Sequence, residues 1–366
     1  MHIPDGYLSP STCAVLYAGA APFWYVALSR VRRLLHTRLI PLISLFAAFS
    51  FVAMMFNIPL PGGTTGHAAG IGVAAVVLGP WASVLAISVA LIIQALFFGD
   101  GGVTAIGANC FNMAVAGTFT AWAVYRAAAG RSPLASARRA AAAGLAGYAA
   151  LNVAALLTAI EFGIQPMLFL DASGAPLYCP YPLDIAVPAM MAGHLTVAGV
   201  AELLVTAGVV AFLQRTDPSL LAAAAGFKAG DSSAGGLPAP AAARRTLRAL
   251  WIGIGVLMVI APLGLLAAGT AWGEWGASDF ADPAAREEIA RASLNQAPPD
   301  APPQGLHRLS TFWTAPWPDY APPFVRSEAF GYVLSAVFGV GLVILASVGI
   351  GRALGGGVRP SDKAGA

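Results

Sequence analysis

The chain begins with Met1-His2, a pair whose nitrogen atoms can chelate a metal ion. An unblocked α-amine, the amide of His2 and an imidazole nitrogen close a five-membered and a six-membered ring around one ion. Such a planar, nitrogen-rich set suits nickel(II) or copper(II). A fourth nitrogen would complete the square, and His67 in the segment PGGTTGH is the candidate for it. The alternative is that a histidine stands second in the chain without binding a metal.

The composition predicts a membrane protein. Hydrophobic residues make up 58% of the chain and charged residues only 10%, whereas soluble domains carry about 25% charged residues. Several apolar stretches approach the roughly 20 residues that span a bilayer. We therefore expect an all-α polytopic protein whose spans are residues 11–29, 39–57, 68–80, 81–98, 103–126, 140–161, 187–213, 249–270 and 330–351. The third stretch is short, so we expect it to be tilted, broken or partly re-entrant.

The basic residues predict the orientation, because lysine and arginine favour cytoplasmic loops. With the N-terminus outside, nine spans place the C-terminus inside, and all but four of the 20 lysines and arginines fall on the inner side. The four exceptions lie in one long outer loop, and long loops follow the rule weakly. The net charge of +3 then reflects inner loops, and we expect no nucleic-acid binding, which would need a basic face or stripe. Met1-His2 and residues 58–67 share the outer face, where two imidazoles can meet.

Composition also divides the chain into parts. Residues 1–215 are expected to form a compact core of seven helices. Residues 216–246 are rich in Ala, Gly, Ser and Pro, which is typical of a flexible, here cytoplasmic, linker. Residues 247–366 should form a two-helix hairpin around a long extracytoplasmic loop, residues 271–329, whose prolines resist regular structure. The tryptophans of this loop either anchor it at the membrane interface or dock it on the core.

Five motifs carry a resemblance to a known family. MHIPDGYLSP, NIPLPGGTTGH and FGDGGVTAIGANCFNMA resemble the NikM/CbiM family, the substrate-binding (S) components of energy-coupling-factor (ECF) transporters for nickel and cobalt. PLGLLAAGTAWGEWG and WPDY resemble the NikN/CbiN auxiliary subunit, here fused through the linker. The resemblance covers almost the whole chain except the linker. It implies that the amine of Met1, the amide and imidazole of His2, and His67 hold the metal.

Other residues are candidates for supporting this site. Asp5 would orient a ligating imidazole, or it is an ordinary turn aspartate. Gly66 lets the backbone approach the metal closely, or it belongs to a glycine-rich hairpin. Asn109 and Asn112 resemble the family's asparagine pair and either hold the N-terminal loop or join helices. His194 is an ionisable group inside the bilayer and therefore a functional candidate, although packing or partner docking is favoured for it.

The sequence predicts a transport subunit and not an enzyme. Its only lysines, Lys228 and Lys363, are each followed by alanine, so a P-loop is absent. No resident cofactor is expected; the ligand is transported Ni²⁺ or Co²⁺. The resemblance implies a transmembrane coupling (T) subunit and a pair of cytoplasmic ABC ATPases as partners, within the cytoplasmic (inner) membrane of a prokaryote. The expected function is capture of the metal at the outer face for ATP-driven uptake.

Two alternative functions stay open at this point. One is a cobalt uptake component that supplies cobalamin biosynthesis. GGTTGH and MHIPDG look more like the nickel branch, and a planar nitrogen site favours nickel over cobalt. The other is a secondary metal carrier that works without an ATPase. Such folds usually show internal repeats and charges at the bilayer midplane, for which only Glu202 and His194 are candidates.

Overall fold

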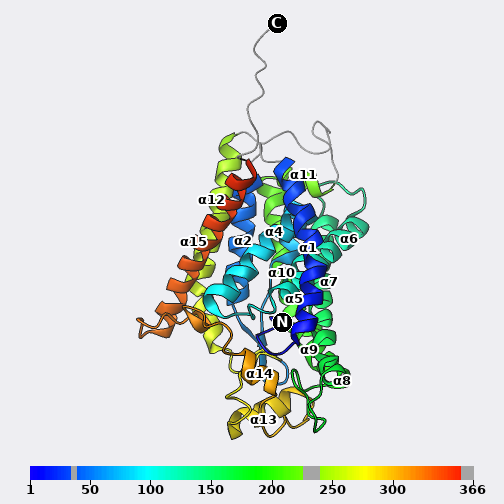
Figure 1. The fold of residues 1–366 in the computed structure, drawn as a ribbon. Coiled ribbons are helices and arrows are strands. Elements are labelled where there is room, and N and C mark those ends of the chain that lie inside the picture. The colour runs from blue at the N-terminus through cyan, green and yellow to red at the C-terminus, as the bar shows by residue number, and fades with distance from the viewer. Residues whose placement is uncertain (34–38, 226–239, 356–366) are drawn as a thin grey trace.

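Long apolar helices that pack side by side make up most of the structure (Figure 1). The computed structural model describes residues 1–33, 39–225 and 240–355. Within these residues, six helical segments are long and apolar enough to cross a membrane. They are Pro10–Arg32, Pro80–Phe98, Ala137–Leu168, Leu183–Thr216, Arg244–Leu266 and Glu328–Leu354. The chain is therefore a polytopic helical membrane protein, as its composition predicts.

The first part of the chain contains most of the helices and one short hairpin. Its elements are α1 (Pro10–Arg33), α2 (Leu39–Met55), β1 (Ile58–Leu60), β2 (Thr64–Gly66), α3 (Ile71–Leu78), α4 (Pro80–Ile93), the π-helical η1 (Gln94–Phe98), α5 (Ile106–Asn109), the π-helical η2 (Cys110–Gly117), α6 (Thr118–Ala129), α7 (Ala137–Gly163), α8 (Gln165–Leu168), α9 (Leu183–Gly193), the π-helical η3 (His194–Ala198), α10 (Gly199–Thr216) and α11 (Ser219–Ala225). Helix α3 has eight residues and a length of about 12 Å at 1.5 Å per residue. It is too short to cross about 30 Å of hydrocarbon alone, so the third expected span is short in the structure as well.

The second part packs along one side of the first. Its elements are α12 (Pro240–Ile260), the 3₁₀ segment η5 (Ala261–Leu266), α13 (Pro283–Ala292), α14 (Gln304–Leu309), the 3₁₀ segment η6 (Pro318–Tyr320) and α15 (Glu328–Gly355). Helices α12 and α15 both contact α2. Within the linker expected at 216–246, α11 and the start of α12 are helical; residues 226–239 lie outside the described residues.

The outer loop expected at 271–329 is docked on the core and contains the helices α13 and α14. Trp272 is 4% exposed and packs against Phe162 and Tyr181 of the first part. Arg286 donates hydrogen bonds to the carbonyls of Phe280, Pro298 and Pro299, and this guanidinium thereby ties together backbone that prolines keep out of regular structure. Trp272 therefore docks the loop on the core, which is one of the two roles expected for the loop tryptophans.

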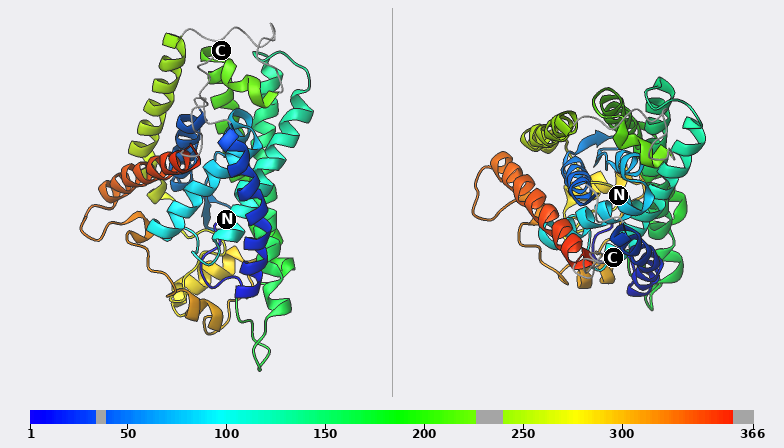
Figure 2. Two further views of the ribbon diagram at one scale, coloured as in Figure 1. Left: turned by 45° about the horizontal axis from the view of Figure 1, so that its top comes forward. Right: turned by 90° about the horizontal axis from the view of Figure 1, so that it is seen from above.

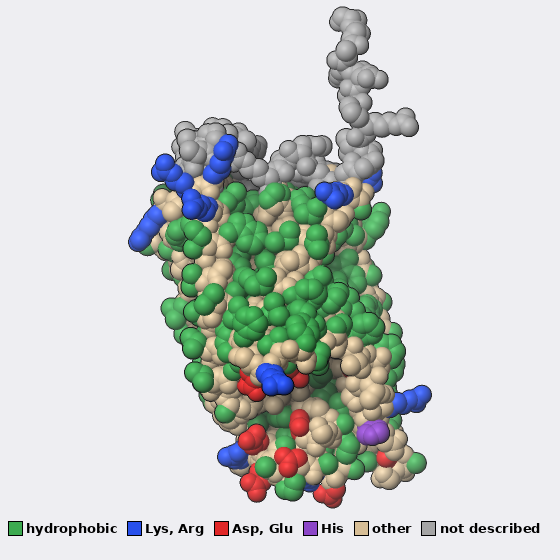
Figure 3. All heavy atoms as spheres, turned by 90° about the vertical axis from the view of Figure 1, so that its left-hand side faces the viewer, with side chains coloured by type: hydrophobic (Ala, Val, Ile, Leu, Met, Phe, Trp, Pro, Cys, Tyr) green, Lys and Arg blue, Asp and Glu red, His purple; other side chains and the backbone are tan. Residues whose placement is uncertain are grey.

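The two ends of the bundle carry opposite charge. Figure 3 shows lysine and arginine side chains gathered at one end, a hydrophobic band below them, and most acidic side chains at the other end, among the loops. The N-terminus lies near the acidic end, and in both Figure 1 and the right-hand view of Figure 2 it sits among the helices. Met1 is 2% exposed. The first residue is thus buried within the fold.

Candidate metal-binding site

The N-terminal segment is held in place by the loop and helix start at residues 101–109. The Ile3 amide donates to Asn109 Oδ1 at 2.8 Å, and Asn109 Nδ2 donates back to the Ile3 carbonyl at 3.2 Å. That carbonyl also accepts from the Gly102 amide at 2.8 Å. Asp5 accepts from the amides of Val103 and Thr104 at 3.1 and 2.8 Å. These bonds fix the position of Met1 and His2.

Glycine at position 102 makes this close approach possible. A Cβ atom there would lie 2.3 Å from the Asp5 amide nitrogen and 2.7 Å from the Pro4 carbonyl carbon, both of them backbone atoms. Any other residue would push the N-terminal segment away.

The hairpin of β1 and β2 presents His67. Its strands pair antiparallel, with Ile58 opposite Gly66, and Gly62 and Gly63 take positive φ values of 89° and 81° in the turn. A Cβ atom at Gly66 would lie 2.7 Å from a Leu60 methyl group, so a larger residue there would require the Leu60 side chain to move. His67 follows directly after β2, so the hairpin brings its imidazole under the N-terminal segment.

A buried carboxylate holds the segment that follows His67. Glu202 on α10 is fully buried and accepts from the amides of Ala69, Gly70 and Gly72 at 2.8, 2.9 and 3.1 Å. The first amides of a helix have no partner within the helix, and a negative charge is stabilised there. Glu202 therefore fixes the start of α3 and, through it, the backbone at His67. Sequence reasoning noted Glu202 only as a charge in the bilayer, since nothing in the sequence links it to a loop about 130 residues away.

The structure brings Met1, His2 and His67 together. The rings of His2 and His67 are stacked with centroids 5.1 Å apart and planes inclined by 26°. The Met1 amine lies 3.1 Å from Glu274 Oε1, and His2 Nδ1 lies 2.5 Å from Asp100 Oδ1. His2 Nε2 is buried and has no hydrogen-bond partner among the described residues. Two nitrogens of the expected chelate are thus each held by a carboxylate.

The surroundings of the site keep the carboxylate of Asp100 charged and the imidazole of His67 neutral. Burial alone would raise the pKa of Asp100, but the charge and hydrogen bond of His2 lower it to about 2. Burial, together with the charges of His2 and the N-terminal amine, holds the pKa of His67 well below its usual 6.5. The neutral imidazole is the form that ligates a metal. His67 Nδ1 lies 3.2 Å from the Ala68 carbonyl, so Nε2 is the nitrogen left for a ligand.

The second part of the chain completes the site. Tyr320 donates its hydroxyl proton to Asp100 Oδ2 at 2.5 Å, and Gln94 donates to both Asp100 and Tyr320. Burial and the charge of Asp100 hold the pKa of Tyr320 well above 10, so it stays a donor. A cavity of about 300 Å³ adjoins these groups. Its lining includes His2, His67, Asp100, Glu274, Asp319, Tyr320 and Tyr332.

Three of the expected supporting residues lie in other contacts. Asp5 bonds backbone amides and not an imidazole; Asp100 is the carboxylate that contacts His2, which corrects the expectation for Asp5 as an imidazole partner. Asn112 donates to Thr158 and Glu161, and so joins η2 to α7. His194 Nδ1 contacts the Met190 carbonyl at 2.8 Å, while its ring lines a small gap beside Met1.

Sequence reasoning missed the roles of Asp100, Glu274 and Tyr320. All three stand in motifs quoted for the resemblance, FGDGG, GEWG and WPDY, so the motifs were the available signal. Within residues 1–33, 39–225 and 240–355, no group of three or more His, Cys, Asp or Glu side chains is placed to hold a metal ion. The expected chelate uses only two side chains and takes its other nitrogens from the main chain.

Comparisons with known proteins match two families, one after the other along the chain. The family described as cobalt uptake substrate-specific transmembrane region, CbiM, matches residues 2–220, and the PDGLE domain matches residues 247–356. The fused nickel transport protein NikMN of Rhodobacter capsulatus is 59% identical over 97% of this chain and 97% of its own length. The probable fused nickel transport protein LarMN of Lactiplantibacillus plantarum is 41% identical over 94% of this chain and 96% of its own.

Two further similarities extend to cobalt transport and to a solved structure. The cobalt transport protein CbiM of Geobacter sulfurreducens is 37% identical over 72% of each chain. A crystal structure described as a truncated transition metal transporter is 47% identical, has a TM-score of 0.56, and covers 59% of this chain and 99% of that one. The chain therefore belongs to the CbiM family of metal transport proteins and carries a CbiN-like PDGLE domain in its second part.

Proposed function

We propose that this chain captures Ni²⁺ at the outer face of the membrane, as the substrate-binding component of an ATP-driven ECF uptake transporter. The observation that carries the proposal is the convergence of the Met1 amine, His2 and His67 in one buried site. The relatives that match along almost the whole chain are named as nickel transport proteins, which favours nickel over cobalt as the cargo.

The proposed chelate follows from ring geometry. The amine and amide nitrogens close a five-membered ring, and the amide nitrogen and His2 Nδ1 close a six-membered one. Nε2 of His67 supplies the fourth nitrogen of a square plane suited to Ni²⁺. Binding exchanges the contacts that the amine and Nδ1 make with Glu274 and Asp100 for bonds to the ion. To ligate the ion, the amine, the His2 amide and Nδ1 each give up the proton that stands in the way of the bond, and these protons pass to the solvent.

Transport then needs partners. We propose that residues 1–215 form a seven-helix core and that residues 247–366 form a hairpin around the docked loop 271–329, joined by a linker at 216–246. The basic end of the bundle faces the cytoplasm, so the metal site faces outward. A transmembrane coupling subunit and two ABC ATPases reorient the chain and release the ion inside.

Uptake of radioactive ⁶³Ni²⁺ into cells tests this function. We expect uptake when the chain is produced with the coupling subunit and ATPases, and none when the P-loop lysine of each ATPase is replaced. Uptake that persists with inactive ATPases would instead support a secondary carrier. Equal or greater uptake of ⁵⁷Co²⁺ in the same cells would move the assignment from nickel to cobalt.

The docked loop has a separate test. Because residues 271–329 supply Glu274 and Tyr320 to the site, their deletion should abolish uptake while residues 1–215 still reach the membrane. Unchanged uptake after this deletion would remove the loop from the mechanism and leave the chelate proposal intact.

A further inference from the structure

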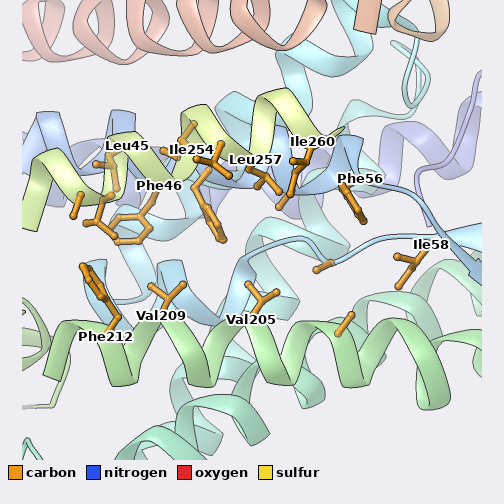
Figure 4. Close-up of a pocket in the computed structure, with 18 residues that line it drawn as sticks. Leu45, Phe46, Phe56, Ile58, Val205, Val209, Phe212, Ile254, Leu257 and Ile260 are labelled. Atoms are coloured by element: carbon orange, nitrogen blue, oxygen red, sulfur yellow. The ribbon is translucent and has the colours of Figure 1, made fainter. Parts of the chain in front are cut away.

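An apolar groove runs between the two parts of the chain, and one of its ends reaches Ile58 and Ala68, next to the hairpin that presents His67. It has a volume of about 610 Å³ and lies between α2, α10 and α12. Figure 4 shows side chains of α12 and α10 pointing toward one another across it, with aromatic rings of α2 at its side. Typical lining residues are Phe46, Val205, Phe212, Leu257 and Ile260. Its α10 and α12 residues belong to helical segments long and apolar enough to cross a membrane, so we expect lipid and not water around the groove.

The groove is bounded by close approaches of α12 to both of its neighbours. Residues of α12 come within 8 Å of residues of both α2 and α10, measured between Cα atoms. A helix with its side chains is about 10–12 Å wide, so it cannot pass between these neighbours where they meet. An acyl chain is much thinner, and it would restore the van der Waals contacts that the facing side chains lack.

The length of the groove matches one leaflet of a bilayer. Along α12 the lining runs from Ala249 to Ile260, which is about 17 Å at 1.5 Å per residue. Half of the hydrocarbon core of a bilayer is about 15 Å thick. A single acyl chain of one leaflet therefore fits along the groove from end to end.

Positive charge stands at one end of the groove. Arg245 lies four residues before the lining residue Ala249 on α12, and Arg215 lies three residues after the lining residue Phe212 on α10. Spacings of three and four place each arginine on the same helical face as its lining neighbour. Both arginines are exposed and belong to the basic end of the bundle. Arginines at this level attract anionic headgroups.

We propose that this groove binds one phospholipid with an anionic headgroup. Its acyl chain lies between α2, α10 and α12, and its phosphate lies between Arg215 and Arg245. The lipid joins the first helix of the PDGLE domain to the core, so it acts as a structural ligand that links the two parts of the fused chain.

Two glycines of α12 give a matched test of the acyl chain. A Cβ atom at Gly253 or at Gly255 meets nothing within 4 Å, but only Gly253 lines the groove. The full-length protein in detergent is titrated with phosphatidylglycerol and examined by native mass spectrometry. We expect one tightly bound lipid per chain in the wild type and in Gly255→Phe, and at least tenfold weaker binding in Gly253→Phe.

A second variant tests the headgroup site and leaves the lining of the groove unchanged. The wild type should prefer phosphatidylglycerol over phosphatidylcholine by about thirtyfold, and the double variant Arg215→Gln/Arg245→Gln should lose this preference. Equal binding of phosphatidylglycerol by Gly253→Phe and Gly255→Phe, with similar melting temperatures, would overturn the proposed acyl site. A wild type that binds both lipids equally would overturn the headgroup site. If Gly253→Phe keeps its lipid but loses the coupling subunit on purification, the groove is a protein contact and the proposal is wrong.

Discussion

The imidazole rings of His2 and His67 lie stacked with their centroids 5.1 Å apart, although α1 and α2 separate them along the chain. The backbone beside each histidine is held by a different buried polar side chain. Asn109 bonds both main-chain polar groups of Ile3, next to His2, and Glu202 bonds the amides that follow His67. The meeting of the two histidines thus depends on side chains that bond the backbone beside them, as well as on Asp100 at the His2 ring.

Replacing Glu202 by glutamine tests the support of His67. The amide has a single acceptor oxygen where the carboxylate offers two to the amides of Ala69, Gly70 and Gly72, so the loop loosens. We expect the affinity for Ni²⁺ to fall about 10–100-fold, measured by isothermal titration calorimetry. Glu161→Gln is the control, because Glu161 is also buried but bonds Asn112. An equal loss in both variants would contradict a specific role for Glu202.

Adding a methyl group at Gly102 should displace the N-terminal segment. The new Cβ would meet the Asp5 amide nitrogen at 2.3 Å, and overpacking of this kind costs about 1–3 kcal/mol. Gly208→Ala on α10 is the control, because a Cβ there meets nothing within 4 Å and alanine favours the helix by about 1 kcal/mol. The melting temperature of Gly208→Ala should equal or exceed that of the wild type, and that of Gly102→Ala should be clearly lower. The reverse order would contradict the close packing of Gly102 against the backbone of Asp5.

The stability of the metal-free protein should fall as the pH decreases below 6.5. The pKa of His67 is lowered by burial, so the unfolded chain binds a proton near pH 6.5 that the folded one does not, and folding is disfavoured increasingly below that pH. The lowered pKa of Asp100, about 2, acts in another window: its stabilisation is present above its ordinary pKa of 3.8 and is lost only as the pH falls through 3.8 towards 2.

The variant His67→Asn separates these effects. Its free energy of unfolding should decline less steeply between pH 6.5 and 5 than that of the wild type, by up to about 1.4 kcal/mol per pH unit. Chemical unfolding in the presence of a chelator, followed at several pH values, provides the measurement. Identical slopes for the two proteins would show that His67 is not held neutral by the fold.

Tyr320→Phe tests the contribution of the second part of the chain to the site. It removes the hydroxyl that donates to Asp100, a hydrogen bond to a charged group that is worth about 1.5–3 kcal/mol. We expect Ni²⁺ binding to weaken about tenfold or more because Asp100, which gives up its contact with His2 when the ion binds, is then no longer held by Tyr320 beside the cation. Tyr332→Phe is the control, since Tyr332 lines the same cavity but donates to the Met55 carbonyl. A larger loss from Tyr332→Phe would contradict the role given to Tyr320.

The helices follow from the sequence more directly than the site does. The apolar run expected at 81–98 forms α4 and η1, residues 80–98, and the run expected at 187–213 lies within α9 to α10, residues 183–216, because bilayer thickness alone sets the length of such runs. The bonds of Glu202 to the His67 loop and of Tyr320 to Asp100 join residues more than 100 positions apart. Residue type and spacing alone do not predict such contacts.

Asp5 and Asp100 illustrate the same limit. Both stand in glycine-containing turns near a histidine or an asparagine of interest, and residue type alone does not tell which carboxylate faces the His2 ring. In the structure Asp100 contacts the His2 ring, whereas Asp5 accepts hydrogen bonds from the amides of Val103 and Thr104. The sequence pattern does not indicate the direction of either side chain.

The first residue of the chain is, in the proposed chelate, itself a ligand, and an N-terminal extension tests this most directly. Ni²⁺ binding to the purified full-length chain is compared with binding to a version that carries one extra glycine before Met1. Because the Met1 amine is buried beside Glu274, the extension should abolish stoichiometric Ni²⁺ binding. Equal binding by both versions would contradict the chelate and would place the metal around His67 without the N-terminus.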